Sequence, residues 1–342
     1  MFIRVRDLHV SFATYGGSVS AVRGVNLDIE RGKCLAIVGE SGCGKSVTAQ
    51  TLMRLIPTPP ADVRGSIIMD AVDLLSLPEK KMKEIRGRKI GMIFQDPMTS
   101  LDPTMQIGHQ IMEGLCVHNR RMSRRDAEAR VCEVLGLVGI PNPEKQFRRY
   151  AYEFSGGMRQ RVMIAMAVIC NPQLLIADEP TTALDVTTQA QILDLIRGLK
   201  ARLETAIVII THDMGVVSNM ADRIAVFYAG QVVEEGCAED VFYNPSHPYT
   251  AALLLSRPRL DRDRNQKLVS IAGAPPDLFA PPLGCCFFDR CSVSMEICRE
   301  HPPAFFGIND RGHRALCWLH HPLGERQRRV WLAEREVVGE RG

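Results

Sequence analysis

Gly39-Glu-Ser-Gly-Cys-Gly-Lys-Ser46 is a glycine-rich loop that directly follows the apolar run Cys34-Leu-Ala-Ile-Val38. The loop fits the pattern G-x-x-x-x-G-K-[ST], and residues 47–56 behind it are predicted to form a helix. In this strand–loop–helix arrangement, backbone N–H groups wrap around a phosphate chain at a helix N-terminus. We expect Lys45 to reach the β- and γ-phosphates and the Ser46 hydroxyl to bind Mg²⁺. The residues assigned to the nucleotide are Gly39, Ser41, Gly42, Cys43, Gly44, Lys45, Ser46 and Val47.

The composition is ordinary for a globular protein, and the length suggests about two domains. The 342 residues are 46% hydrophobic and 24% charged, which excludes collagen-like, low-complexity and wholly disordered chains. A net charge of only +3 gives no bulk basicity for nucleic-acid binding. Apolar stretches such as 162–170 fall short of the roughly 18 residues of a membrane-spanning helix. Charges close to Met1 also disrupt a signal peptide, so we expect the protein to stay in the cytosol.

The pattern of apolar residues predicts an α/β core. Short continuous apolar runs at 34–38, 174–177 and 206–210 are typical of strands buried on both faces, and helical patterns lie between them. This alternation favours a parallel sheet. Residues 2–10 and 21–29 instead alternate between apolar and polar, as strands with one solvated face do.

Further along the chain, residues 97–153 contain no convincing strand, which predicts a helical insertion of about 97–160. Residues 223–228 and 231–234 flank Ala229-Gly230 and predict a hairpin. A charged, Pro-containing linker is expected at 256–267. The predicted organisation is a nucleotide-binding domain over 1–255, a Cys-rich extension over 256–322 and a charged tail over 323–342.

Two acidic residues end the apolar run at 174–177. Asp178 and Glu179 are costly at the end of a buried strand unless they have a task there. Asp178 suits Mg²⁺ coordination, and Glu179 suits activation or orientation of an attacking water. His212 follows the run at 206–210 and is expected to donate a hydrogen bond to a γ-phosphate. The carboxyl ends of parallel strands would bring these groups to one edge of the sheet.

Phe154-Ser-Gly-Gly-Met158 lies between the glycine-rich loop and the acidic pair, and with it the sequence resembles the nucleotide-binding subunit of an ABC transporter. The string is similar to that family's signature motif, Leu-Ser-Gly-Gly-Gln. The resemblance implies that Ser155, Gly156 and Gly157 complete the ATP site of a partner subunit, so that a head-to-tail dimer encloses two ATP molecules. Met158 departs from the family pattern and lacks the glutamine amide.

The same resemblance implies a P-loop NTPase (RecA-like) core with an antiparallel β subdomain and a helical signature subdomain. Gln95, in Phe94-Gln-Asp-Pro97, looks like the Q-loop residue that senses Mg²⁺ and the γ-phosphate. Asp185, in Thr182-Ala-Leu-Asp185, looks like the D-loop residue that faces the opposite site. An aromatic side chain near the N-terminus stacks on adenine in the family; Phe12 aligns best with it, and Tyr15 is the alternative.

Four longer strings resemble the peptide-import group of this family. They are Lys45-Ser-Val-Thr48, Gln95-Asp-Pro-Met-Thr-Ser-Leu-Asp102, Ser155-Gly-Gly-Met-Arg-Gln-Arg161 and Asn244-Pro-Ser-His-Pro-Tyr-Thr250. The resemblance implies ATP hydrolysis at the cytoplasmic face of the cell (inner) membrane. It also implies a second ATPase subunit, two membrane permeases and an extracytoplasmic substrate-binding protein as partners.

Two alternatives remain in view. Some members of the group handle nickel rather than peptides, and the transported solute cannot be read from this subunit. A soluble ABC ATPase that acts on DNA or ribosomes is a different class. Such proteins usually carry a long coiled coil or a second cassette, and this sequence has neither a sustained heptad repeat nor a second glycine-rich loop.

The 11 cysteines are unevenly distributed. Six are scattered and are interpreted mostly as small buried hydrophobic residues in a reducing compartment: Cys34, Cys43, Cys116, Cys132, Cys170 and Cys237. The segment Gly284-Cys-Cys-Phe-Phe-Asp-Arg-Cys291 resembles one that the subfamily carries after its ATPase domain. Relatives imply a structural [4Fe–4S] cluster on Cys285, Cys291, Cys298 and Cys317, with Cys286 as a bystander. Zinc, for which paired knuckles are missing, and four reduced thiols or a disulfide are the alternatives.

Overall fold

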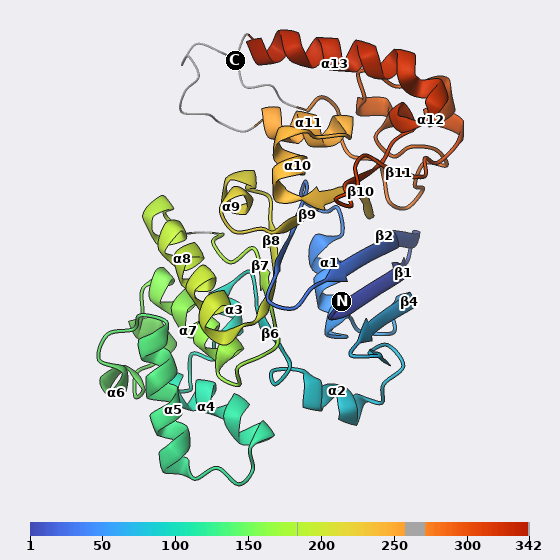
Figure 1. The fold of residues 1–342 in the computed structure, drawn as a ribbon. Helices are drawn as coiled ribbons and strands as arrows, with labels where there is room; N and C mark the ends of the chain where they lie inside the picture. Colours follow the sequence, from blue (N-terminus) through green and yellow to red (C-terminus); the bar gives the residue numbers. More distant parts are fainter. Residues whose placement is uncertain (183, 257–270, 341–342) are drawn as a thin grey trace.

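A computed structural model describes residues 1–182, 184–256 and 271–340, and the two sheets of this part of the chain are built from twelve strands (Figure 1). The main sheet has the order β11-β12-β10-β9-β3-β8-β7-β6, and the smaller sheet has the order β2-β1-β4-β5. The strands are β1 (Ile3–Thr14), β2 (Gly17–Ile29), β3 (Cys34–Val38), β4 (Ala61–Met69), β5 (Val72–Asp73), β6 (Ile90–Ile93), β7 (Leu174–Asp178), β8 (Ala206–Thr211), β9 (Arg223–Tyr228), β10 (Gln231–Cys237), β11 (Phe305–Gly307) and β12 (Arg314–Leu316).

The α-helices pack mainly around the main sheet and below it in the insertion (Figure 1). They are α1 (Lys45–Leu52), α2 (Glu79–Ile85), α3 (Pro97–Ser100), α4 (Ile107–His118), α5 (Arg124–Leu137), α6 (Pro143–Gln146), α7 (Gly156–Val168), α8 (Val186–Leu203), α9 (Met214–Ser218), α10 (Ala238–Tyr243), α11 (Pro248–Leu255), α12 (Glu296–Glu300) and α13 (Glu325–Glu340). The predicted helix at 47–56 is shorter than expected, because Arg54 adopts a left-handed conformation with φ +51°.

The centre of the main sheet is parallel and buried on both faces, as the apolar runs predict. β3 pairs in parallel with β8 and β9, and β7 pairs in parallel with β6 and β8. In β3, Cys34, Ala36 and Val38 face the core cluster shared with α4, α5, α7 and α8. Leu35 and Ile37 face the opposite cluster, which includes the smaller sheet and α1. The sheet therefore divides the interior into two hydrophobic cores.

The smaller sheet is antiparallel, and its first two strands are longer than the sequence pattern indicated. β1 and β2 stay paired from Ile3 with Ile29 to Thr14 with Gly17. A tight turn at 15–16 therefore ends this hairpin, and the turn carries a candidate adenine-binding residue.

The insertion between β6 and β7 is helical. Residues 97–153, all of which the structure describes, contain no strand, in agreement with the prediction. β6 itself was not predicted. It lies at one edge of the main sheet, pairs with β7 and ends two residues before Gln95. The sequence hairpin at 223–228 and 231–234 is confirmed as β9 and β10.

The C-terminal extension joins the main sheet. β12 pairs antiparallel with β10, with Ala315 opposite Glu234, and β11 pairs with β12. The tail begins with the long helix α13 at the top of the molecule (Figure 1). The predicted linker falls almost entirely in 257–270, outside the described residues.

The scattered cysteines only partly match the prediction that they are buried. Cys34 and Cys43 are buried, whereas Cys132, Cys170 and Cys237 are half-buried. Cys116 is exposed, which corrects the prediction, because it lies on the outer side of α4 in the insertion.

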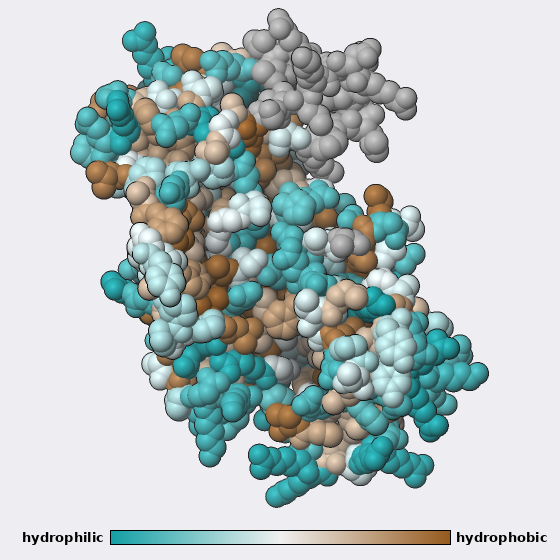
Figure 2. All heavy atoms as spheres, turned by 180° about the vertical axis from the view of Figure 1, so that it is seen from behind, coloured by the Kyte–Doolittle hydropathy of each residue, from teal (hydrophilic) through white to brown (hydrophobic). Residues whose placement is uncertain are grey.

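The face opposite to that of Figure 1 carries hydrophilic residues interspersed with small groups of apolar ones (Figure 2). Among the described residues, no helix combines the length and apolar character needed to cross a membrane.

Candidate functional site

The glycine-rich loop connects β3 to α1, and two of its glycines are required by close backbone approaches. A Cβ on Gly39 would overlap the carbonyl oxygen of Phe227, and a Cβ on Gly44 would overlap that of Ala21. Gly44 also has φ +95°, a conformation that favours glycine. The Lys45 side chain is buried, and its Nζ donates to the carbonyl oxygens of Gly39 at 2.9 Å and Glu40 at 2.8 Å. The ammonium group is therefore held against the first two residues of the loop.

Asp178, the last residue of β7, stands next to the start of α1. The Ser46 hydroxyl donates a hydrogen bond to Asp178 Oδ1 at 2.9 Å. Burial raises the pKa of the Asp178 carboxyl, and the neighbouring Glu179 charge raises it further. A cation beside this pair would favour the ionised carboxylate. Hydroxyl and carboxylate oxygens suit Mg²⁺, so the two residues fit the predicted site.

Glu179 is the meeting point of residues from three strand ends. Gln95 Nε2, after β6, donates to Glu179 Oε2 at 3.1 Å, and His212 Nδ1, after β8, lies 3.4 Å from Glu179 Oε1. Thr182 Oγ1 donates to Oε2 at 2.9 Å. The sequence predicted that Glu179 and His212 meet at one edge of the sheet, and Gln95 was expected near the γ-phosphate only from the family resemblance. The contact of Thr182 with Glu179 was missed. The signal that could have predicted this contact is a hydroxyl-bearing residue three positions after the acidic pair.

The signature segment forms the N-terminus of α7. Ser155 caps this helix, and its side chain accepts from the Met158 N–H at 3.4 Å. Gly156 and Gly157 lie against the beginning of α8, where a Cβ on Gly157 would crowd Thr188. α7 packs on β6, α4, α5 and α8, and Figure 1 shows it across the central strands from α1. The signature residues therefore do not join the phosphate loop of their own chain.

One further contact connects the signature helix to the segment that follows β7, and a second one caps α8. Gln160, which sequence reasoning did not single out, is buried and donates to the Pro180 carbonyl oxygen at 2.7 Å. Asp185 caps α8 by accepting from the Thr188 N–H at 2.9 Å. Hydrogen bonding to Thr188 lowers the pKa of Asp185. A movement of α7 would therefore be transmitted through the Gln160 side chain to Pro180, the residue that follows Glu179.

The two candidate adenine-binding aromatics differ in their surroundings. Phe12 is half-buried and packs against the core of the smaller sheet. Tyr15 is fully exposed at the turn between β1 and β2. The ring of Phe279, from the C-terminal extension, lies beside Gly16 and Gly17 of the same turn.

Four of the five cysteines of the extension are those expected to bind a cluster: Cys285, Cys291, Cys298 and Cys317. Burial raises the pKa of the Cys285 thiol to about 12 and that of Cys291 to about 11, with charges on neighbouring cysteines adding to both shifts. Burial likewise raises the pKa of Cys317, and charges on Cys285, Cys291 and Cys298 add to it. All four are free thiols. Within the described ranges, however, no three His, Cys, Asp or Glu side chains form a group that could hold a metal ion.

Cys286, next to Cys285, has side-chain partners outside the extension. Its Sγ accepts a hydrogen bond from Arg23 Nη1 at 2.9 Å and lies 3.4 Å from Gln231 Oε1. These partners belong to β2 and β10, so the side chain is engaged with the cassette.

A phosphate loop after the central parallel strand β3, an acidic pair at the end of β7 in the same sheet, and a helical insertion that ends in the signature helix define an ABC transporter ATPase. A family model described as "ABC transporter" matches residues 22–182, and one described as "Oligopeptide/dipeptide transporter, C-terminal region" matches residues 233–298. The chain belongs to the oligopeptide/dipeptide family of ABC transporter ATP-binding proteins. The expected fold class and family are therefore confirmed. The alternative of a soluble ABC ATPase that acts on DNA or ribosomes is not supported.

Curated relatives match nearly the whole chain. An oligopeptide transport ATP-binding protein, OppD of Bacillus subtilis, is 55% identical over 94% of this chain and 89% of its own length. A dipeptide transport ATP-binding protein, DppD of the same organism, is 52% identical over 93% and 94%. Among solved structures, the dimeric post-hydrolysis state of the cassette MJ0796 bound to ADP and Pi has a TM-score of 0.62 at 28% identity, covering 69% of this chain and 98% of that one.

Proposed function

We propose that this chain hydrolyses ATP as one of two ATPase subunits of an importer for di- or oligopeptides. The observation that carries the proposal is the convergence of Ser46 and Asp178, and of Gln95, Glu179 and His212, at the carboxyl ends of four parallel strands. The substrate class rests on the printed names of the relatives, which describe oligopeptide and dipeptide transport.

Each residue at this edge has a role in the proposed reaction. Lys45 would leave the carbonyl groups of Gly39 and Glu40 to pair with the β- and γ-phosphates. Ser46 and Asp178 would hold Mg²⁺, with Gln95 as a further oxygen ligand, and the ion would neutralise charge on the phosphate oxygens. Glu179 would orient the attacking water and accept its proton.

The groups around Glu179 keep this carboxylate in position. Gln95 and Thr182 both donate to Oε2, which leaves Oε1 directed toward His212 and the approaching water. His212 is largely exposed and would donate a hydrogen bond to the γ-phosphate when ATP is bound. The Tyr15 ring would stack on adenine, because Phe12 is already engaged with the core.

The signature residues would act on the second subunit's ATP. Ser155, Gly156 and Gly157 present backbone N–H groups at the start of α7, away from their own phosphate loop. Asp185, at the start of α8, would face the opposite site. We expect the isolated chain to hydrolyse ATP slowly. Turnover should appear on assembly and rise with loaded binding protein; full, substrate-independent activity of the isolated chain would contradict the sandwich.

The partners in the proposed complex are a second ATPase subunit, two membrane permeases and an extracytoplasmic substrate-binding protein. The chain would sit peripherally at the cytoplasmic face of the cell (inner) membrane. The proposed ATP-binding domain spans 1–255 and includes a helical insertion of about 97–160. The Cys-rich extension over 256–322 and the charged tail over 323–342 follow it. Reconstitution with the partners from the same operon, with di- and oligopeptides and nickel as competing substrates, tests the solute. Uptake of nickel but not peptides would overturn the peptide assignment.

A structural [4Fe–4S] cluster on Cys285, Cys291, Cys298 and Cys317 is a separate proposal. Its support is an all-sulfur donor set, which iron–sulfur clusters use, and the backbone hydrogen bond in which the Cys285 N–H donates to the Cys298 carbonyl oxygen at 2.7 Å. Because the thiols do not form a ready metal site, the cysteines would have to rearrange and lose their protons on loading.

Protein purified without oxygen tests the cluster. We expect brown protein with an absorption band at about 400 nm and about four irons per chain. Cys291→Ser and Cys298→Ser should each lose the colour. Cys286→Ser is the matched control and should keep it, since its sulfur contacts Arg23 instead. Colourless, iron-free wild-type protein would refute the cluster, and one bound zinc would support the alternative metal.

A further inference from the structure

The C-terminal extension grips the phosphate loop through one ion pair. Arg290, in the Cys-rich segment, donates from Nη1 to Glu40 Oε2 at 2.7 Å and from Nη2 to Glu40 Oε1 at 2.8 Å. Glu40 is the second residue of the glycine-rich loop, 250 positions away in the chain. The Arg290 side chain is only 4% exposed. This two-pronged geometry fixes orientation as well as distance.

Every polar group of Glu40 is engaged. Its carboxylate pairs with Arg290, its N–H donates to Tyr249 Oη at 2.9 Å, and its carbonyl oxygen accepts from Lys45 at 2.8 Å. Arg290 is itself held in place, since Nη1 also donates to Tyr228 Oη at 3.2 Å and Nε to the Ala272 carbonyl oxygen at 2.9 Å. Residues of β9, α11 and the extension therefore hold the beginning of the phosphate loop in place through hydrogen bonds and the ion pair.

Charge gives this ion pair a functional meaning. Glu40 places a carboxylate in a loop whose task is to bind a polyphosphate, and an unpaired negative charge there would repel the ligand. Arg290 neutralises it at short range in a largely buried setting. The same arginine thus supplies both a tether for the loop and compensation for its unfavourable charge.

We propose that Arg290 is a positioning residue for ATP binding, so that the docked C-terminal extension sets the nucleotide affinity of the phosphate loop. The inference rests on the proposed binding of ATP at this loop. Arg290 would not touch the nucleotide; it acts through Glu40 and, beyond Glu40, on the carbonyl groups that hold Lys45.

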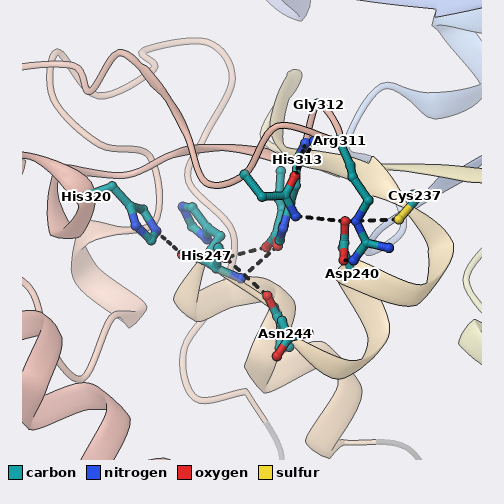
Figure 3. Close-up of polar contacts among 12 residues, drawn as sticks. Cys237, Asp240, Asn244, His247, Arg311, Gly312, His313 and His320 are labelled. Atoms are coloured by element: carbon teal, nitrogen blue, oxygen red, sulfur yellow. Dashed lines mark hydrogen bonds and ion pairs between the residues drawn. The ribbon is translucent and has the colours of Figure 1, made fainter.

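A second contact between extension and cassette provides a matched control. Arg311 pairs with Asp240 and with Glu239, the latter at 3.2 Å, at the start of α10 (Figure 3). His313 Nε2 lies 2.7 Å from the buried carboxylate of Glu234 in the same region. This patch is at the opposite end of the sheet from the phosphate loop. β9 runs parallel to β3, and β10 returns antiparallel until Cys237 pairs with Arg223 at the start of β9.

The test compares Arg290→Met with Arg311→Met in the full chain. Binding of a fluorescent ATP analogue is titrated, thermal unfolding is recorded, and KM and kcat for ATP are measured in the assembled transporter. We expect Arg290→Met to weaken nucleotide binding about tenfold and to raise KM more than it lowers kcat. Arg311→Met should lower the melting temperature but leave nucleotide affinity within about twofold of wild type, since Arg311 pairs with the start of α10 and does not contact Glu40 or the phosphate loop.

A double variant separates the effect of the unpaired Glu40 charge from the effect of losing the contact between the extension and the loop. Glu40→Gln added to Arg290→Met removes the unpaired carboxylate and should recover most of the lost affinity. If Arg290→Met fails to fold, Arg290→Lys keeps the charge without the fork and should give an intermediate loss of affinity. Wild-type affinity in folded Arg290→Met or Arg290→Lys, or an equal loss in Arg311→Met, would overturn the proposal. Normal binding by Lys45→Ala would instead refute the ATP site itself.

Discussion

Replacing Glu179 with glutamine tests the proposed catalytic role of this residue with little change in the shape of its side chain. Glu179 Oε2 accepts from Gln95 at 3.1 Å and from Thr182 at 2.9 Å, and the amide oxygen of a glutamine can accept both bonds. The amide nitrogen then takes the place of Oε1, facing His212. What the Glu179→Gln variant loses is the negative charge and the ability to accept a proton from water.

The size of the effect follows from that loss. A positioned general base contributes about 10²- to 10⁴-fold to the rate, which is about 3–5 kcal/mol of activation free energy. The contacts of Lys45 with the loop and of Ser46 with Asp178 do not involve Glu179. We therefore expect the affinity for MgATP to stay within about twofold, while hydrolysis at this site slows by two to four orders of magnitude.

The assay has to isolate this chain, because the second ATPase subunit of the complex has a site of its own. A radioactive azido-ATP analogue is added to the assembled transporter, allowed one turnover, cross-linked and separated chain by chain. We expect ATP rather than ADP on the Glu179→Gln chain. As a control, Thr182→Val removes one hydrogen bond from Oε2, at about 1 kcal/mol, and should slow hydrolysis only about fivefold. Wild-type conversion to ADP on the Glu179→Gln chain would refute the assignment of Glu179.

Three further outcomes are expected. Lys45→Ala should weaken nucleotide binding and hydrolysis together in a titration of the full chain, because the γ-phosphate loses its counter-charge. Gly39→Ala should strongly lower the melting temperature of the nucleotide-free protein, because the new Cβ would overlap the Phe227 carbonyl oxygen. In Gly42→Ala the new Cβ meets nothing within 4 Å, so this variant should lose only about 1–2 kcal/mol through left-handed backbone strain. Equal melting temperatures for the two variants would contradict this reasoning. Burial lowers the pKa of His247 to about 3. As the pH falls below about 6.5, His247 is protonated in the unfolded state but stays neutral in the folded state, so the free energy of unfolding decreases as the pH decreases. His247→Asn keeps a cap for α11, and urea unfolding at pH 7 and pH 5 should show the wild type losing about 2 kcal/mol more than this variant.

The elements around the phosphate site could be predicted from the sequence because their signals are local. The buried strands β3, β7 and β8 each consist of a short apolar run, and the loop at 39–46 carries its own glycines and lysine. Parallel strands in one sheet expose their carboxyl ends at one edge, so Asp178, Glu179 and His212 were expected there together. The hairpin of β9 and β10 was predicted for the same reason, from a turn and its flanking residues.

Residues without a distinctive local pattern were missed or left open. β6 is only four residues long, and its place at the sheet edge depends on pairing with β7. Thr182 and Gln160 resemble many other polar residues in the chain until the fold brings them to Glu179 and Pro180. Phe12 and Tyr15 are both aromatic residues near one turn, and only packing separates a half-buried ring from an exposed one.

The sequence by itself determined the family, the phosphate loop and the acidic pair Asp178 and Glu179, because each depends on a short run of residues and its immediate neighbours. Only the tertiary structure decided how the C-terminal extension meets the ATPase core. β12 adds to the edge of β10, and Arg290 pairs with Glu40 across 250 positions of sequence. Such pairs depend on how two distant surfaces pack together, and neither the arginine nor the glutamate carries a local signal that names its partner.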